Sequence, residues 1–157
     1  MPGRKQGRPG AAGDFDLDAQ PGIAFRRLAN LSHAMFLEMS GQSEITGPQL
    51  TVLVTLAQKG PQIQSEIGKA VGMDKNTIAE MLRRMETRGL VSRKPLQTDR
   101  RAVGISITAE GRRTAAALVT PAKDVGTALI APLPPEYRPL FAKCLDILVA
   151  AHLDKRE

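Results

Sequence analysis

The sequence has little of what several classes of protein require. Its 157 residues include one cysteine, two histidines, no tryptophan and only 3% aromatic residues. One cysteine cannot form a disulfide within the chain, and neither histidine has a second ligand at helical spacing, so we expect no disulfide, metal site or cofactor. Scarce aromatic rings argue against single-stranded nucleic acid, which proteins bind by base stacking. Duplex DNA stays open as a partner because Arg and Lys side chains carry that binding.

Long apolar runs and catalytic motifs are also absent. No apolar stretch approaches the ~18 residues of a membrane span, and the Gly-, Pro- and Arg-containing start lacks the apolar segment of a secretory signal. The sequence contains no nucleophile elbow, no phosphate-binding loop and no pairing of a base with a nucleophile. We therefore expect a one-domain cytoplasmic protein with no membrane partner and no enzymatic activity.

Positive charge is concentrated in the middle of the chain, whose formal net charge is +6. Residues 61–113 hold eleven basic and six acidic residues, whereas residues 14–60 hold three and five. Residues 1–13 add three basic residues and no acid, and residues 114–157 are neutral. A basic centre between neutral or acidic flanks is typical of a DNA-binding segment on a structural frame.

Apolar spacing predicts a mainly helical chain. The last predicted helix carries Leu140, Leu148 and a buried, inert Cys144 on one apolar face. Pro121 either kinks or splits the helix before it. The aspartates of the N-terminal arm either offset its basic start or enter the first helix. In order, the predicted helices cover residues 21–40, 48–59, 64–71, 75–88 and 109–119, and the last ends near residue 151.

The periodicity changes to that of strands between Val91 and Thr108. Residues 91–94 and 103–107 are predicted to form two strands, the second with Val103, Ile105 and Ile107 on one face, and a basic tip lies between them. Two short helices joined by a Gly-containing turn and followed by a hairpin indicate a winged helix-turn-helix. In that fold the second short helix buries an apolar stripe, here Ile78, Met81, Leu82 and Met85, and presents polar side chains to the major groove.

Three stretches of the chain, residues 64–78, 82–93 and 98–111, resemble the multiple-antibiotic-resistance regulator (MarR) family. The most specific is an Asp-Arg-Arg wing at residues 99–101, followed by a Thr-x-x-Gly helix start at Thr108. The order and length of the helices also fit the family. The resemblance implies a mainly α fold with a small β-hairpin wing, in which a winged helix-turn-helix lobe joins a helical dimerisation lobe.

The apolar balance of the chain predicts a homodimer. Both end segments carry long apolar stripes that the remaining core is too small to cover, so we expect them to interlock with a second copy. A dimer places two recognition helices about one DNA turn apart, which predicts a pseudo-palindromic operator. The predicted organisation is a flexible arm over residues 1–19, a dimerisation helix over 20–45, the DNA-binding lobe over 46–113 and C-terminal dimerisation helices over 114–153.

The resemblance implies a set of DNA-contacting residues. Asp99 pairs with Arg101 to shape the wing, and Arg101 enters a minor groove, where A·T-rich sequence has the strongest negative potential. Asn and Arg side chains of the second short helix can read adenine and guanine, while Ser65 holds a phosphate. For the helix arginines the competing interpretation is a solvated face, and for Arg88 it is a helix-dipole partner. The predicted DNA-binding residues are Ser65, Lys75, Asn76, Thr77, Arg83, Arg84, Arg93, Asp99, Arg100 and Arg101.

The chain departs from the family pattern at three places. Ile63 stands where a hydroxyl usually caps the first short helix, so Glu66 lacks its capping-box partner. Glu80 stands where many relatives have Arg, and it either accepts a hydrogen bond from cytosine N4 or repels phosphate. Pro139 predicts a late start for the last helix.

The resemblance also implies control by a small molecule. Relatives commonly bind aromatic carboxylates, phenols or aromatic acyl-coenzyme A thioesters, so we expect a repressor that such an effector releases from DNA. Two other interpretations are a sequence-indifferent architectural DNA-binding protein and a protein-interaction adaptor that kept the winged fold. The candidate effector residues are His33, Met35, Phe36, Met39, Leu50 and Val54. The competing interpretation is that these residues only pack in the core, or, for His33, that it lies at the surface or in an interface.

Overall fold

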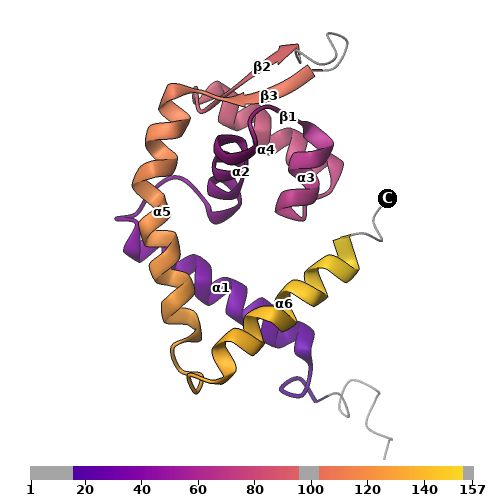
Figure 1. Cartoon of the computed structure of the whole chain (residues 1–157), viewed down its shortest axis with the longest axis vertical. Helices are drawn as coiled ribbons and strands as arrows, with labels where there is room; N and C mark the ends of the chain where they lie inside the picture. Colours follow the sequence, from indigo (N-terminus) through magenta and orange to yellow (C-terminus); the bar gives the residue numbers. More distant parts are fainter. Residues whose placement is uncertain (1–15, 96–102, 154–157) are drawn as a thin grey trace, which may run out of the picture.

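The computed structural model describes residues 16–95 and 103–153, and these residues form two lobes. Helices α2 to α4 and a small sheet make a compact lobe, and α5 leads from it to a second lobe that contains α1 and α6 (Figure 1). The fold class is therefore as predicted, mainly helical with a β-hairpin wing. The elements are α1 (Pro21–Met39), α2 (Gly47–Lys59), β1 (Gln62–Ile63), α3 (Gln64–Val71), α4 (Lys75–Thr87), β2 (Val91–Pro95), β3 (Val103–Ile107), α5 (Ala109–Ile130) and α6 (Tyr137–Leu153).

The sheet contains one strand more than the predicted hairpin. Its three strands are antiparallel in the order β1-β3-β2, with Gln62 opposite Ile105 and Val91 opposite Ile107. The prediction of a shared inner face holds for Ile105 and Ile107, which are buried or packed against the core. It is wrong for Val103, whose side chain is 54% exposed because it lies at the outer end of the strand, beyond the packed core.

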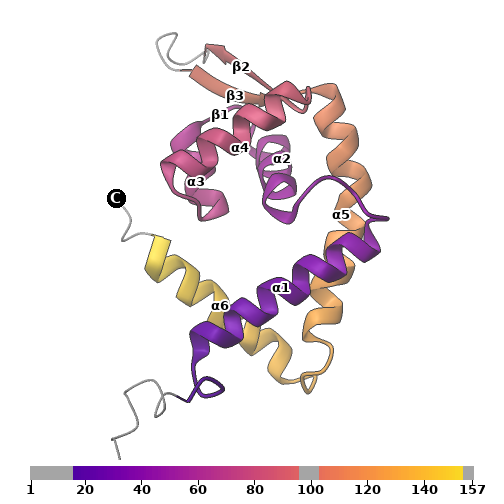
Figure 2. The ribbon, with the colours of Figure 1, turned by 180° about the vertical axis from the view of Figure 1, so that it is seen from behind.

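The core lies in the winged lobe and extends between α1 and α5. The predicted apolar stripe of α4 is buried throughout, against Leu53 and Leu56 of α2 and Ile67 of α3. Helices α1 and α5 pack on one another, as both views of the chain show, and α1 contributes Phe36 to the core (Figure 2). The buried face of α4 thus fixes the helix against α2 and α3, and its other face is exposed.

Side-chain caps explain where several helices begin. The Thr46 hydroxyl accepts from the Gln49 N–H at 3.4 Å, and the Gln49 side chain accepts from the Thr46 N–H at 3.0 Å, which completes a capping box. At α3 the Glu66 carboxylate accepts from the Ile63 N–H at 3.2 Å, but the isoleucine side chain has no acceptor for the N–H of Glu66. Half of a capping box is present, and α3 still begins at Gln64.

Two prolines disturb their helices less than predicted. Helix α5 continues through Pro121 to Ile130, so the option of a split helix is wrong. Helix α6 begins at Tyr137 with Pro139 in its first turn, so the late start is wrong as well. The first turn of a helix has N–H groups without intrahelical partners, and a proline there loses no hydrogen bond.

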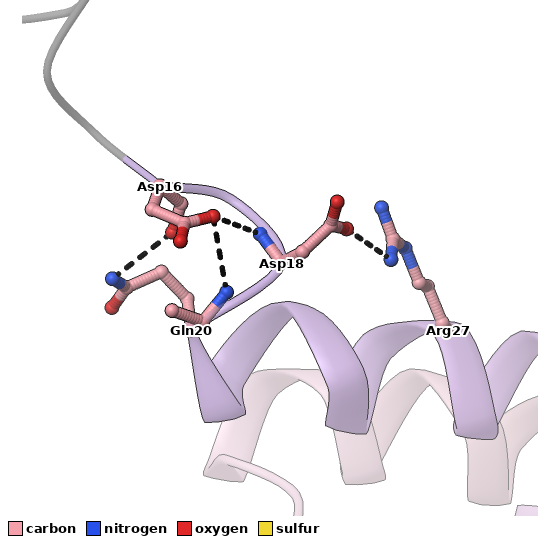
Figure 3. A network of polar contacts seen from close by, with 5 residues as sticks. Asp16, Asp18, Gln20 and Arg27 are labelled. Carbon is pink, nitrogen blue, oxygen red and sulfur yellow. Dashed lines mark hydrogen bonds and ion pairs between the residues drawn. The ribbon is translucent and has the colours of Figure 1, made fainter.

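A turn of acidic residues leads into α1 (Figure 3). The Asp16 carboxylate accepts from the N–H groups of Asp18 and Ala19, at 3.1 and 3.3 Å, and the Asp16 carbonyl accepts from the Gln20 side chain. Asp18 pairs with Arg27 at 2.8 Å. Asp16 and Asp18 therefore precede the helix instead of entering it, and Asp14 lies outside the described residues.

Helix α6 leaves apolar side chains uncovered. Leu140 is 59% and Leu148 44% exposed, and no residue of α6 is buried. Cys144 is exposed too, so the prediction of a buried thiol is wrong for the single chain, in which the face of α6 that carries Cys144 is left open to solvent. None of the helices within residues 16–95 and 103–153 is long and apolar enough to cross a membrane.

Candidate functional site

Helices α3 and α4 are joined by a tight turn. Gly72 ends α3 in the left-handed conformation (φ 76°), and the Met73 N–H donates to the Gly68 carbonyl at 3.0 Å. At Gly68 a β-carbon would lie 3.3 Å from the Met73 carbonyl oxygen and 3.4 Å from Ile78 Cγ2, so any larger residue would require the turn or α4 to shift by a few tenths of an ångström. The Gln64 side chain donates to the Lys75 carbonyl at 3.3 Å, across the start of both helices. These contacts set the angle at which α4 is presented.

Asp74 caps the start of α4. Its carboxylate accepts from the N–H groups of Asn76 and Thr77, at 2.9 and 3.0 Å, and from the Thr77 hydroxyl at 2.6 Å. The Thr77 hydroxyl bond is the main reason that the pKa of Asp74 lies below its ordinary value. The hydroxyl of Thr77, a predicted DNA ligand, is therefore occupied by the cap in this structure.

The face of α4 opposite its apolar stripe is exposed and polar. Glu80 lies in the middle of this face, one turn after Asn76 and one turn before Arg83. Its carboxylate pairs with Arg83 through two hydrogen bonds, at 2.8 and 3.0 Å, and lies 3.7 Å from the Arg84 guanidinium. The hydrogen bonds from Arg83 lower the pKa of Glu80 and raise that of Arg83. This pairing was not predicted, although its i, i+3 spacing is visible in the sequence.

Two further ion pairs attach α4 to its surroundings. Arg93 of β2 contacts Glu86 at 3.1 Å, which links the first wing strand to the helix. Arg88 contacts the Glu44 carboxylate at 3.1 Å and its carbonyl at 3.3 Å, so its partner is the loop between α1 and α2. Ser65 is exposed near the start of α3. The predicted wing ligands Asp99, Arg100 and Arg101 lie outside the described residues.

A cavity of about 530 Å³ lies where α1, α2 and α5 meet. Three predicted effector residues line it, namely His33, Phe36 and Leu50. Of the other three, Met35 and Val54 pack against the core and Met39 is exposed near the end of α1. Two hydroxyl residues of the lining, Ser32 and Thr51, were not predicted. Spacing could have found the α1 side, because the residues that α1 contributes to the lining are Ala29, Ser32, His33 and Phe36.

The arrangement defines a class of protein. A short helix, a glycine turn, a second helix with one buried and one exposed polar face, and an adjoining hairpin form a winged helix-turn-helix. Proteins of this class place the second helix in the major groove of duplex DNA.

Comparison with known proteins identifies the family. The sequence profile described as MarR family matches residues 45–103. The transcriptional regulator HosA of Escherichia coli O127:H6 is 36% identical over 98 residues, which cover 62% of this chain and 73% of HosA. The HTH-type transcriptional repressor NicR of Pseudomonas putida is 29% identical over 111 residues, 71% of this chain and 70% of NicR. The chain belongs to the MarR family of transcriptional regulators.

A solved relative shares most of the fold. The structure of BpsR from Bordetella bronchiseptica, which describes regulation of its DNA binding by 6-hydroxynicotinic acid, superposes with a TM-score of 0.77. The match has 25% sequence identity and covers 85% of this chain and 96% of that one. The likeness therefore includes both lobes.

Proposed function

We propose that the protein is a homodimeric transcriptional repressor that binds a pseudo-palindromic operator and is released by a small aromatic acid. The observation that carries the proposal is α4, whose apolar face is fully buried while Asn76, Arg83 and Arg84 stand exposed on the other side. The repressor name of NicR and the aromatic acid that regulates BpsR support the direction of control and the kind of effector. The proposed function places the protein in the cytoplasm and assigns it no cofactor.

The geometry divides the DNA contacts into two kinds. Lys75 and Ser65 lie in the first turns of their helices, where the helix dipole also favours an anion, so we assign them to phosphates. Asn76, Arg83 and Arg84 lie along the exposed face of α4, where side chains reach base edges in the major groove. In the wing we propose that Asp99 pairs with Arg101, that Arg101 enters a minor groove and that Arg100 also contacts DNA.

Sequence preference tests the proposed function. We expect the wild-type protein to bind the promoter region beside its own gene at least ~10³-fold more tightly than random duplex, in an anisotropy titration with random DNA as competitor. Binding to all duplexes with similar affinity would instead identify an architectural protein. No binding to duplex DNA at all would leave the adaptor interpretation.

The cavity between α1, α2 and α5 is the proposed effector site. It is lined mainly by apolar side chains, with the polar groups of Ser32 and His33 proposed to orient a ring carboxylate, while the Thr51 hydroxyl donates to the Gly47 carbonyl at 3.1 Å. Because α1 and α5 extend into the helical lobe while α2 belongs to the winged lobe, a ligand here would alter how the lobes are held (Figure 2). Coupling of about 1–3 kcal/mol suffices to weaken DNA binding about 5- to 150-fold.

The effector is tested in the same titration. Benzoic, hydroxybenzoic and nicotinic acids are added to the preformed complex with the promoter duplex, beside an aromatic acyl-coenzyme A thioester. We expect release by a single-ring acid, because the DNA binding of BpsR is regulated by such an acid and the cavity of about 530 Å³ is large enough to hold one. Release only by the thioester would assign the effector to the larger class, with its nucleotide outside the cavity.

The uncovered face of α6 is the proposed dimer surface. Glutamate in place of both Leu140 and Leu148 should raise the dimer dissociation constant at least ~100-fold. The dimer would bury these two positions between its subunits, and burial of a glutamate charge without a partner is unfavourable. Lys143→Glu is the control, since it changes the net charge by the same two units on the same helix. Sedimentation of each variant over a range of concentrations measures the constant. A double variant that dimerises like the control would exclude this surface.

A further inference from the structure

Glu80 is the acidic residue on the exposed polar face of α4 between Asn76 and Arg83. Glu86, the other acid of this helix, lies to one side and pairs with the wing strand through Arg93. Duplex DNA presents phosphates along both edges of the groove that α4 would enter, and a carboxylate there repels them. A negative charge at this place therefore opposes the binding that the rest of the face favours.

The carboxylate also offsets part of the positive charge of the two arginines beside it. It holds Arg83 in a planar, two-bond pairing and lies near Arg84, while all three side chains remain half or more exposed to solvent. Exposed ion pairs of this kind are weak and open easily. The pairing therefore makes Arg83 less attractive to a loosely approaching phosphate, and Arg83 can still turn to a base once α4 is seated in the groove.

Close seating of α4 removes water from the Glu80 carboxylate. That loss is unfavourable unless a hydrogen-bond donor replaces the water. Phosphates and guanine offer only acceptors on the surfaces that α4 meets, whereas cytosine N4 and adenine N6 offer amino donors in the major groove. Every base pair carries one amino group in the major groove, so the base that faces Glu80 decides whether close docking is favourable.

We propose that Glu80 is a specificity-determining residue, which keeps Arg83 and Arg84 from binding DNA non-specifically and makes close docking depend on a base amino group opposite its carboxylate. The inference rests on the proposed function, because it assumes that α4 reads an operator. It differs from the proposed function in assigning discrimination to a repulsive residue instead of to the basic ones.

Replacement of the carboxylate by an amide separates the two roles of Glu80. Glu80→Gln keeps the size and one acceptor but removes the charge, so Arg83 and Arg84 become free to bind phosphates. We expect binding to a scrambled duplex to tighten about 3- to 10-fold and the slope of log K against log salt to steepen by about one unit for each phosphate gained per duplex. The preference for operator over scrambled duplex should fall about tenfold.

The experiment uses the full chain and two defined duplexes. The first is the consensus selected by the wild-type protein from a randomised duplex library, and the second is the same composition scrambled. Glu80→Asp keeps the charge on a shorter side chain and should retain weak non-specific binding. This variant therefore separates the effect of the charge from the effect of side-chain length. Glu110→Gln is the matched control, because Glu110 also pairs with an arginine three residues on, Arg113, but on α5. Thermal unfolding of each variant verifies that the fold is intact.

The outcomes distinguish the inference from the proposed function. A wild-type protein that selects no consensus overturns both. A wild-type protein that selects one, together with a Glu80→Gln variant whose scrambled-duplex affinity and salt slope match those of wild type or of Glu110→Gln, overturns the inference alone. Tighter, steeper and less selective binding by Glu80→Gln, with Glu80→Asp close to wild type, supports it.

Discussion

Alanine at both Arg83 and Arg84 is expected to weaken operator binding by at least ~100-fold and to remove most of the preference over random duplex. A single arginine contact to a base contributes about 1–3 kcal/mol, and a symmetric dimer loses four such side chains at once. The double variant also leaves Glu80 without the two positive charges beside it, so its repulsion of phosphate increases. Anisotropy titration with operator and random duplexes at fixed salt measures both quantities.

The control for this variant is alanine at both Arg112 and Arg113. These are also two consecutive exposed arginines, and their loss changes the net charge equally, but they belong to α5. We expect them to lower affinity for operator and random duplex by a similar small factor. Equal losses of operator affinity in the two double variants would mean that the α4 arginines act only through the net charge of the protein and not through base contacts.

Alanine in place of Gly111 should destabilise the protein more than alanine at Gly68 or Gly126. A β-carbon at Gly111 would lie 2.1 Å from the Leu90 carbonyl oxygen and 2.9 Å from Ile107 Cγ1. The oxygen cannot withdraw freely, because it also accepts from the N–H and the hydroxyl of Thr108, at 3.1 and 3.0 Å. Relief of the clash therefore has to displace the start of α5 from the strands, and we expect a loss of about 3 kcal/mol in the free energy of unfolding.

Gly126→Ala provides the comparison within the same helix. Nothing lies within 4 Å of its added β-carbon, so the change should stabilise α5 by about 0.5–1 kcal/mol through the lower flexibility of the unfolded chain. Urea unfolding at one fixed protein concentration measures both variants, since dimerisation adds a concentration-dependent contribution. A Gly111→Ala variant that unfolds at the same urea concentration as wild type would show that the packing between the start of α5 and the strands is looser than its contacts indicate.

Local sequence signals were sufficient for most of the fold. The buried stripe of α4 follows from apolar spacing, and the starts of α2, α4 and α5 follow from Thr46, Asp74 and Thr108, whose side chains cap their own helices. Each of these signals acts over one or two turns of chain. The two-residue strand β1 was missed because two residues carry no periodicity, and its pairing with β3 depends on residues more than 40 positions away.

Features that depend on distant or external partners were less predictable. The contact of Arg88 with Glu44 joins residues 44 positions apart, and nothing near either residue indicates it. Cys144 was expected to be buried because it lies on an apolar face, but such a face does not reveal whether its cover comes from the same chain. Within the site, the sequence identified the exposed residues of α4 but not that Glu80 pairs with two of them.

The middle strand β3 has a mechanical consequence. It pairs with β2 on one side and with β1 on the other, and β1 runs into α3 without an intervening residue. If the hairpin contacts duplex DNA as proposed, a force that a bent or overtwisted duplex applies to it would reach the start of α3 through hydrogen-bonded strands. Under the proposed function, the stiffness of the DNA beyond the contacted bases would then contribute to binding.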